Sequence, residues 1–191
     1  MKQENNRAFK EWKTACDEMR DGRQTVLIRK GGIREENDVF EMTDREFFLL
    51  PTYEHQKSAL LKPDAVKKLE QIQSISRNPN EIVIEAYVVV EEILTCVSED
   101  KINSLADEFP WNEDYVKMRF DFNPYDPLYV LLLRVYSLPT AVTLPVIKDY
   151  IGCKSWVTLE RIISLEGLKP ALSDREHVAR REKIHEILSR K

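Results

Sequence analysis

Basic side chains end an apolar segment near the start of the 191-residue chain. Arg29 and Lys30 follow the strand-like run Thr25–Ile28 and precede Gly31 and Gly32. A guanidinium fork, with backbone N–H groups exposed by glycines, is suited to binding an anion such as phosphate. The alternative is a hairpin turn flanked by two solvated cations. Neither glycine pattern typical of nucleotide-binding loops is present, so a nucleotide loop is unsupported.

A second polar cluster, Tyr53-Glu54-His55-Gln56, follows an apolar segment that ends at Pro51. An imidazole titrates at about pH 6.5, so His55 could act as acid or base if Glu54 or Tyr53 oriented it. It could equally contact a ligand, cap the following turn or bond a backbone carbonyl. We therefore treat Tyr53, His55 and Gln56 as ligand-binding candidates and assign no catalytic residue.

A third small, basic and aromatic cluster lies late in the chain, where Lys154 and Trp156 follow Gly152 and Cys153. Exposed aromatic rings can stack on nucleobases, which makes these two residues candidates for the rim of a site. Trp12, in contrast, lies on an apolar stripe and is expected in the core. A single site requires these distant segments to converge. Its predicted members are Arg29, Lys30, Tyr53, His55, Gln56, Lys154 and Trp156.

The sequence predicts neither a metal site nor a cofactor. His55 has no further ligands at metal-binding spacing, and His177 and His185 are expected to be solvated in a charged helix. The three cysteines are far apart and lack a C-x-x-C spacing, which indicates reduced thiols. A nuclease of the PD-(D/E)xK type would need an E-x-K on a strand, and no predicted strand carries one.

The composition is typical of a folded domain, with 42% hydrophobic and 32% charged residues. The net charge of −4 excludes a generally basic nucleic-acid binder but allows a local basic groove. The length favours a single domain. No apolar run approaches the roughly 20 residues that cross a bilayer, so we expect a cytoplasmic protein without a membrane partner.

Apolar spacing predicts a helix over Asn5–Arg20, ended by Gly22, and a final helix over Asp174–Lys191, capped by Ser173. Val157–Ile163 fits either a strand or a short helix. Strands are predicted where β-branched and apolar residues run together. These are Thr25–Ile28, Glu46–Leu50, Glu81–Val97, Leu128–Leu138 (ended by Pro139) and Ala141–Leu144.

Strands interspersed with helices indicate an α+β fold, most simply a small mixed-sheet barrel surrounded by helices, with a C-terminal helix. Arg134 stands alone in an apolar strand and needs a partner if it is buried. Glu85 or Glu91 on the other long strand could be that partner.

Three motifs, LIRKGGI, FLLPTYEHQ and GCKSW, resemble an uncharacterised bacterial family, the domain of unknown function 1802. This similarity covers nearly the whole chain and implies no activity. The order of elements also resembles PUA-like barrels, including the ASCH and EVE domains, which bind RNA or modified bases in a cleft beside the first strand. That resemblance implies a PUA-like β-barrel domain over residues 1–172, a separate charged helix over 173–191, and a cleft near Arg29, Lys30 and the loop 53–56.

Some small ASCH domains hydrolyse acetylated cytidine with a lysine directly after a G-R pair and a threonine three residues further on. Here Gln24 and Leu27 occupy those positions, which argues against that chemistry. The leading hypothesis is a module that binds RNA or a modified nucleobase. A hydrolase acting on nucleic acid or a nucleoside is the alternative. A third is a protein-interaction component, whose C-terminal helix docks a partner or a second copy.

Overall fold

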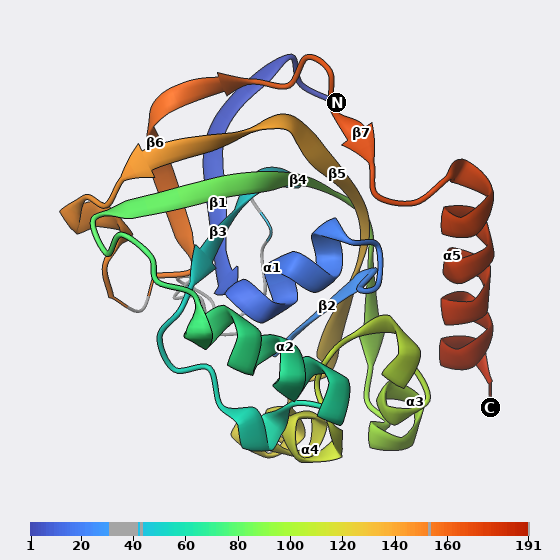
Figure 1. Cartoon of the computed structure of the whole chain (residues 1–191). Coiled ribbons are helices and arrows are strands. Elements are labelled where there is room, and N and C mark those ends of the chain that lie inside the picture. Colours follow the sequence, from blue (N-terminus) through green and yellow to red (C-terminus); the bar gives the residue numbers. More distant parts are fainter. Residues whose placement is uncertain (31–41, 43, 153, 191) are drawn as a thin grey trace.

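Seven strands form one mixed sheet in the computed structural model, which describes residues 1–30, 42, 44–152 and 154–190 (Figure 1). The strand order is β2-β5-β4-β3-β1-β6, with β7 paired to β5. Within the described residues, β1 and β3 form the parallel pair and the other pairs are antiparallel. The α+β prediction with a mixed sheet is confirmed. The strands are β1 Glu4–Trp12, β2 Val26–Arg29, β3 Glu46–Thr52, β4 Glu81–Cys96, β5 Leu128–Pro145, β6 Trp156–Ser164 and β7 Lys169–Pro170.

Helices lie both inside and outside the curve of this sheet. Figure 1 shows α1 within the curve, where it contacts β1, β3, β4 and β5, while α5 lies at the outer edge. Short 3-10 turns precede α2, α4 and β6. The helices are α1 Lys13–Arg20, α2 Pro63–Ser74, α3 Glu99–Asn103, α4 Glu113–Phe122 and α5 Asp174–Ser189, and the turns are η1 Ser58–Leu60, η2 Ala106–Glu108 and η3 Lys148–Tyr150.

The helix predicted over Asn5–Arg20 is wrong in its first half, because residues Glu4–Trp12 form strand β1. This strand pairs with β3 on one side and β6 on the other. Its two faces are both buried: Ala8 packs in one hydrophobic cluster and Phe9 in another. Residues buried on both faces of a strand can imitate the apolar spacing of an amphipathic helix. Here the pairing with β3 and β6 makes the segment a strand. The predicted stop at Gly22 is correct.

Strand β5 continues through Pro139, although a break was predicted there. Ile84 of β4 pairs with Val142, and Ala86 pairs with Ser137, so residues 138–141 lie opposite Glu85 alone. Proline is tolerated within a sheet at such a bulge, because no ladder hydrogen bond is required of it. The two predicted strands are therefore one bent strand.

Two hydrophobic clusters occupy opposite faces of the sheet. Consecutive residues Phe47 and Phe48 of β3 point to different clusters, as strand alternation requires. The first cluster includes Phe9, Phe47, Trp111 and Tyr115 and is covered by α1, α2 and α4. The second includes Phe48, Tyr87, Tyr150 and Leu159. The first cluster positions the site described below.

The C-terminal helix α5 begins with the predicted cap at Ser173, which forms a reciprocal capping box with Glu176. Its Ile184 and Ile187 are buried in the first cluster. His177 is also buried and lies 2.8 Å from a carboxylate oxygen of Glu91, so the expectation of a solvated histidine is wrong.

Arg134 is buried, and its Nη2 donates to Asp174 Oδ1 at 2.5 Å at the start of α5. The predicted partners are wrong, because Glu91 pairs with α5 at another point and Glu85 accepts hydrogen bonds from Lys13 and Arg20. The guanidinium therefore ties the sheet to the helix.

Candidate functional site

Arg29, the last residue of β2, lies against β1. Its Nη2 donates to Glu11 Oε2 at 2.6 Å, and its guanidinium carbon lies 4.5 Å from the centre of the Phe9 ring. Its Nε is buried and has no hydrogen-bond partner among the described residues. One side of the guanidinium is thus fixed by a carboxylate and a ring, while a donor stays unpaired.

Trp156, the first residue of β6, lies on the same ring. Its indole meets Phe9 edge-to-face at 4.8 Å between ring centres and Phe47 at 5.1 Å. Arg7 lies 5.7 Å from the indole centre. Phe9 therefore joins Arg29 and Trp156, two of the predicted site residues that are far apart in the sequence.

Helix α4 supplies the opposite wall. Lys30 Nζ lies 5.0 Å from the centre of the Phe120 ring, and the guanidinium of Arg119 lies 4.9 Å from the centre of the Tyr115 ring. Lys30 is only 3% exposed. Burial lowers the pKa of Lys30, and the charge of Asp126 offsets part of this effect. Neither Lys30 Nζ nor Arg119 Nε has a hydrogen-bond partner in the described part of the chain.

Local sequence fixes α4 in this place. Asn112 caps the helix by accepting from the Tyr115 backbone N–H at 3.1 Å and holds η1 by donating to Ala59 O at 2.8 Å. Trp111 stacks on the Tyr115 ring at 4.6 Å, nearly parallel. Burial raises the pKa of the Tyr115 hydroxyl, and the nearby cation of Arg119 opposes this rise. The Tyr115 ring, held by stacking on Trp111, thus supports the guanidinium of Arg119.

These side chains form what we call the Arg29 cluster. It combines three cations with one tightly paired carboxylate and several aromatic rings. Unpaired buried donors favour a ligand with acceptor atoms, and flat rings favour a ligand with a π-face. The members are Phe9, Glu11, Arg29, Lys30, Tyr115, Arg119, Phe120 and Trp156.

The sequence did not reveal Glu11, because its segment was interpreted as helix. Once β1 is recognised as a strand, Glu11 lies two residues after Phe9 and so on the same face. Tyr115 and Arg119 were not among the predicted site residues. Their aromatic and basic types at a four-residue spacing were the available signal.

The other predicted residues lie elsewhere. Tyr53 carries the guanidinium of Arg77 at 3.8 Å from its ring centre, and it lines a groove of about 220 Å³ beside the second hydrophobic cluster. Burial raises the pKa of Tyr53. Gln56 Oε1 accepts from the backbone N–H of Thr14 at 3.1 Å and from its hydroxyl at 2.8 Å, which ties the loop to α1.

His55 and Lys154 are exposed. His55 adopts a left-handed backbone conformation with φ 59° in a turn. Within the described residues no hydrogen bond joins His55 to a carboxylate, so the hydrolase alternative gains no support from the geometry. Gly31, Gly32 and Cys153 lie outside the described residues.

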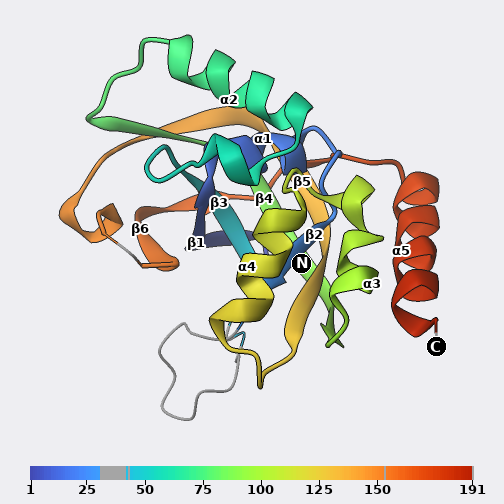
Figure 2. The same ribbon diagram turned by 90° about the horizontal axis from the view of Figure 1, so that it is seen from below.

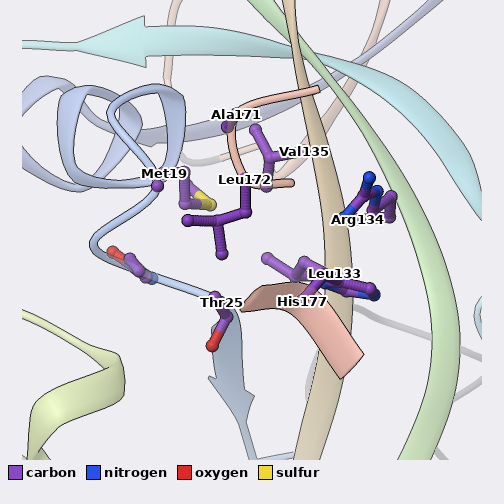
Figure 3. Close-up of a pocket in the computed structure, with 10 residues that line it drawn as sticks. Met19, Thr25, Leu133, Arg134, Val135, Ala171, Leu172 and His177 are labelled. Atoms are coloured by element: carbon purple, nitrogen blue, oxygen red, sulfur yellow. The ribbon is translucent and has the colours of Figure 1, made fainter. Parts of the chain in front are cut away.

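A small cavity lies between α1, the segment before β2, strand β5 and the linker before α5 (Figure 3). Its volume is about 10 Å³, and Leu172, Met19 and Thr25 line it together with Arg134 and His177. This volume is that of about one water molecule. The cavity is therefore too small for a nucleobase, and no member of the Arg29 cluster lines it.

The sequence comparison assigns a family. A family model described as a domain of unknown function, DUF1802, matches residues 8–183. The chain belongs to the DUF1802 family. The matched region runs from within β1 into α5 and so includes every member of the Arg29 cluster. No curated protein matches this DUF1802 chain.

Two solved structures are similar to the DUF1802 chain. One is the ASCH protein of Zymomonas mobilis, with 11% identity, a TM-score of 0.42 and coverage of 93% of each chain. The other is a single-residue mutant of that protein, with 10% identity, a TM-score of 0.42 and coverage of 99% of this chain and 100% of the other.

The described part of the DUF1802 chain contains neither a metal-binding group of side chains nor a helix that could span a membrane. No group of three or more His, Cys, Asp or Glu side chains is arranged to hold a metal ion. No helix among these residues combines the length and apolarity needed to cross a membrane.

Proposed function

We propose that this DUF1802 protein binds nucleic acid and takes a nucleobase against the Arg29 cluster. One observation carries this proposal: three neighbouring cations, Arg29, Lys30 and Arg119, each have a buried nitrogen without a hydrogen-bond partner among the described residues. RNA or a modified base is the ligand class that best matches these donors and the rings beside them.

The energetics favour a ligand over a purely structural role. A buried donor left unpaired costs about 1–3 kcal/mol, and more when it is charged. A base edge presents carbonyl and ring-nitrogen acceptors, and its face can stack on aromatic or guanidinium planes. Binding would therefore satisfy Arg29 Nε and Arg119 Nε at once. Glu11 offsets part of the positive charge, so an isolated phosphate is a less suitable ligand than a base.

The same contacts support a PUA-like barrel as the form of the sheet. Arg29 of β2 touches Glu11 and Phe9 of β1, although β5, β4 and β3 lie between these strands in the sheet order. This approach requires a strongly curved sheet. Curvature of this kind brings the end of β2 against β1 at one site, as the proposed function requires.

Fluorescence anisotropy with labelled single-stranded RNA and DNA at low salt tests the proposal. We expect binding that weakens as salt rises, because the cations of the protein also neutralise backbone phosphates of the strand and release their counterions. Arg119→Ala should weaken binding about tenfold or more, since it removes a charged donor at the site. Arg119 is a better target than Arg29, because removal of Arg29 would leave the Glu11 carboxylate buried without its cation.

The matched control is Lys117→Ala, which removes an equal charge from the solvent-exposed side of the same helix. It should leave affinity nearly unchanged. Circular dichroism must show that both variants are folded. The absence of binding to either oligonucleotide at low salt would disprove the proposal, and so would equal affinities of the two variants.

A further inference from the structure

Two strongly exposed aromatic side chains lie at the end of helix α4 and in the turn that follows it. Phe122 is 72% exposed and Tyr125 is 95% exposed. Every other aromatic residue in the described part of the chain is buried or partly buried. The turn that carries Tyr125 is held by a hydrogen bond from the Asn123 amide to the Asp126 carboxylate. The exposed rings are therefore presented on an ordered turn.

These rings continue the Arg29 cluster toward solvent. Tyr115 and Arg119 are four residues apart and in contact, and Phe122 follows Arg119 by three residues. Residues three and four apart are neighbours on a helix surface. The face of α4 thus runs from the buried Tyr115 ring past Arg119, whose Nε has no partner among the described residues, to the exposed Phe122 ring. Tyr125 follows in the turn after the helix. Figure 2 shows α4 beside β2, which carries Arg29.

The kind of side chain indicates the kind of partner. Proteins that bind single strands combine cations with aromatic rings on which successive bases stack. A site for a free nucleoside would need no such rings outside its pocket. Exposed rings near cations that keep a donor without a partner among the described residues therefore favour a ligand that continues beyond the first base.

We propose, on the basis of the proposed function, that a single-stranded nucleic acid leaves the Arg29 cluster along α4 and stacks neighbouring bases on Phe122 and Tyr125. The ligand is then a strand of several nucleotides rather than a free nucleoside. Met118, four residues before Phe122 and also exposed, extends the apolar surface under the strand.

The test replaces rings by side chains of similar apolarity. The double variant Phe122→Leu, Tyr125→Leu keeps an apolar surface but removes both π-faces. Its affinity for a labelled single strand of about 12 nucleotides should fall about tenfold or more, since stacking on each ring contributes. Tyr125→Phe keeps the ring and should bind as the wild type does. Ile162→Ala removes an exposed apolar side chain from β6 and is the neutral control.

The outcomes separate this inference from the function on which it rests. Binding that depends on Arg119 but is unchanged in the double leucine variant would overturn the inference and leave the proposed function intact. No binding of any single strand at low salt would overturn both. Light scattering of the wild type and the double variant completes the test. A wild-type dimer that becomes a monomer in the variant, with oligonucleotide affinity unchanged, would identify a self-association surface and overturn the inference.

Discussion

Arg29 Nη2 lies 2.6 Å from Glu11 Oε2, although their strands β2 and β1 are separated by three others in the sheet. In a flat sheet the two strands would be about 19 Å apart, four spacings of about 4.8 Å. The pair therefore exists only because the sheet curves around α1. Both side chains are largely buried, with 18% of Arg29 and 9% of Glu11 exposed.

Removing one member of this pair should be costly. Arg29→Met leaves the Glu11 carboxylate buried beside an apolar chain, and we expect the free energy of unfolding to fall by about 3 kcal/mol. The double variant Glu11→Gln, Arg29→Met should recover part of this loss, because no charge is then left unpaired. Urea denaturation at neutral pH measures both values.

The exposed pair Lys67 and Asp64 on α2 provides the comparison for that experiment. Lys67→Met should change the free energy of unfolding by about 0.5 kcal/mol or less, as is usual for surface ion pairs. If Arg29→Met were as mild as Lys67→Met, the two strands would not approach each other as described.

Gly22 lies in the turn after α1 and packs against the linker before α5. Its φ is +73°, and an added Cβ would lie 2.8 Å from Leu172 Cδ2 and 2.9 Å from the Ala171 carbonyl oxygen. Gly22→Ala should therefore lower the free energy of unfolding by about 2–4 kcal/mol, through both backbone strain and overlap. Thermal or urea denaturation checks this value.

Substitution of Gly152 measures the cost of backbone strain alone, without the steric overlap expected at Gly22. Its φ is +87°, and among the described residues no atom beyond the glycine and its chain neighbours lies within 4 Å of an added Cβ. Gly152→Ala should thus cost only the strain of about 1–2 kcal/mol. Equal losses for the two substitutions would show that the linker does not pack on Gly22.

Local patterns in the sequence predicted the strands best where β-branched residues run together, as in β4 and β2. They failed for β1, because Ala8 and Phe9 are buried on opposite faces and so imitate a helical stripe. The same error concealed Glu11. The partners of Arg134 and His177 could not be predicted either, since both depend on where α5 docks.

The candidate site was predictable only in part. Arg29, Lys30 and Trp156 were selected from residue type and position at segment ends, and the structure places them around Phe9 and α4. Gln56 has the same polar character but caps α1 instead. Residue type indicates what a side chain could bind, but long-range strand pairing decides which side chains meet.

Acid should weaken the ion network at the end of α1. Partial burial raises the pKa of Asp21, but hydrogen bonds from Lys68 and Arg23 outweigh this effect and lower it from 3.8 to about 2. A depressed folded-state pKa contributes stability above the unfolded value. This contribution is therefore complete above about pH 4 and is lost as the pH falls toward about 2.

Melting temperatures of the wild type and Asp21→Asn between pH 2 and pH 6 test this dependence. The wild type should melt at a higher temperature near pH 6, and the difference should shrink below about pH 4. Asp64→Asn on the surface of α2 should show no comparable difference. A gap between wild type and Asp21→Asn that stays constant down to pH 2 would contradict the assignment.

The thiol of Cys16 reports whether α1 is enclosed by the sheet. Cys16 is buried, its Sγ donates to the Glu11 carbonyl oxygen at 3.6 Å, and burial together with the Glu11 charge raises its pKa well above the ordinary value. The thiolate is the reactive form, so native Cys16 should resist a thiol reagent that labels the unfolded chain at once.

A Cys153→Ser background leaves two thiols, Cys16 and Cys96, both buried. In that background Val97→Cys adds an exposed thiol that should react immediately, and labelling of Cys16 at a similar rate would mean that α1 does not lie inside the curved sheet.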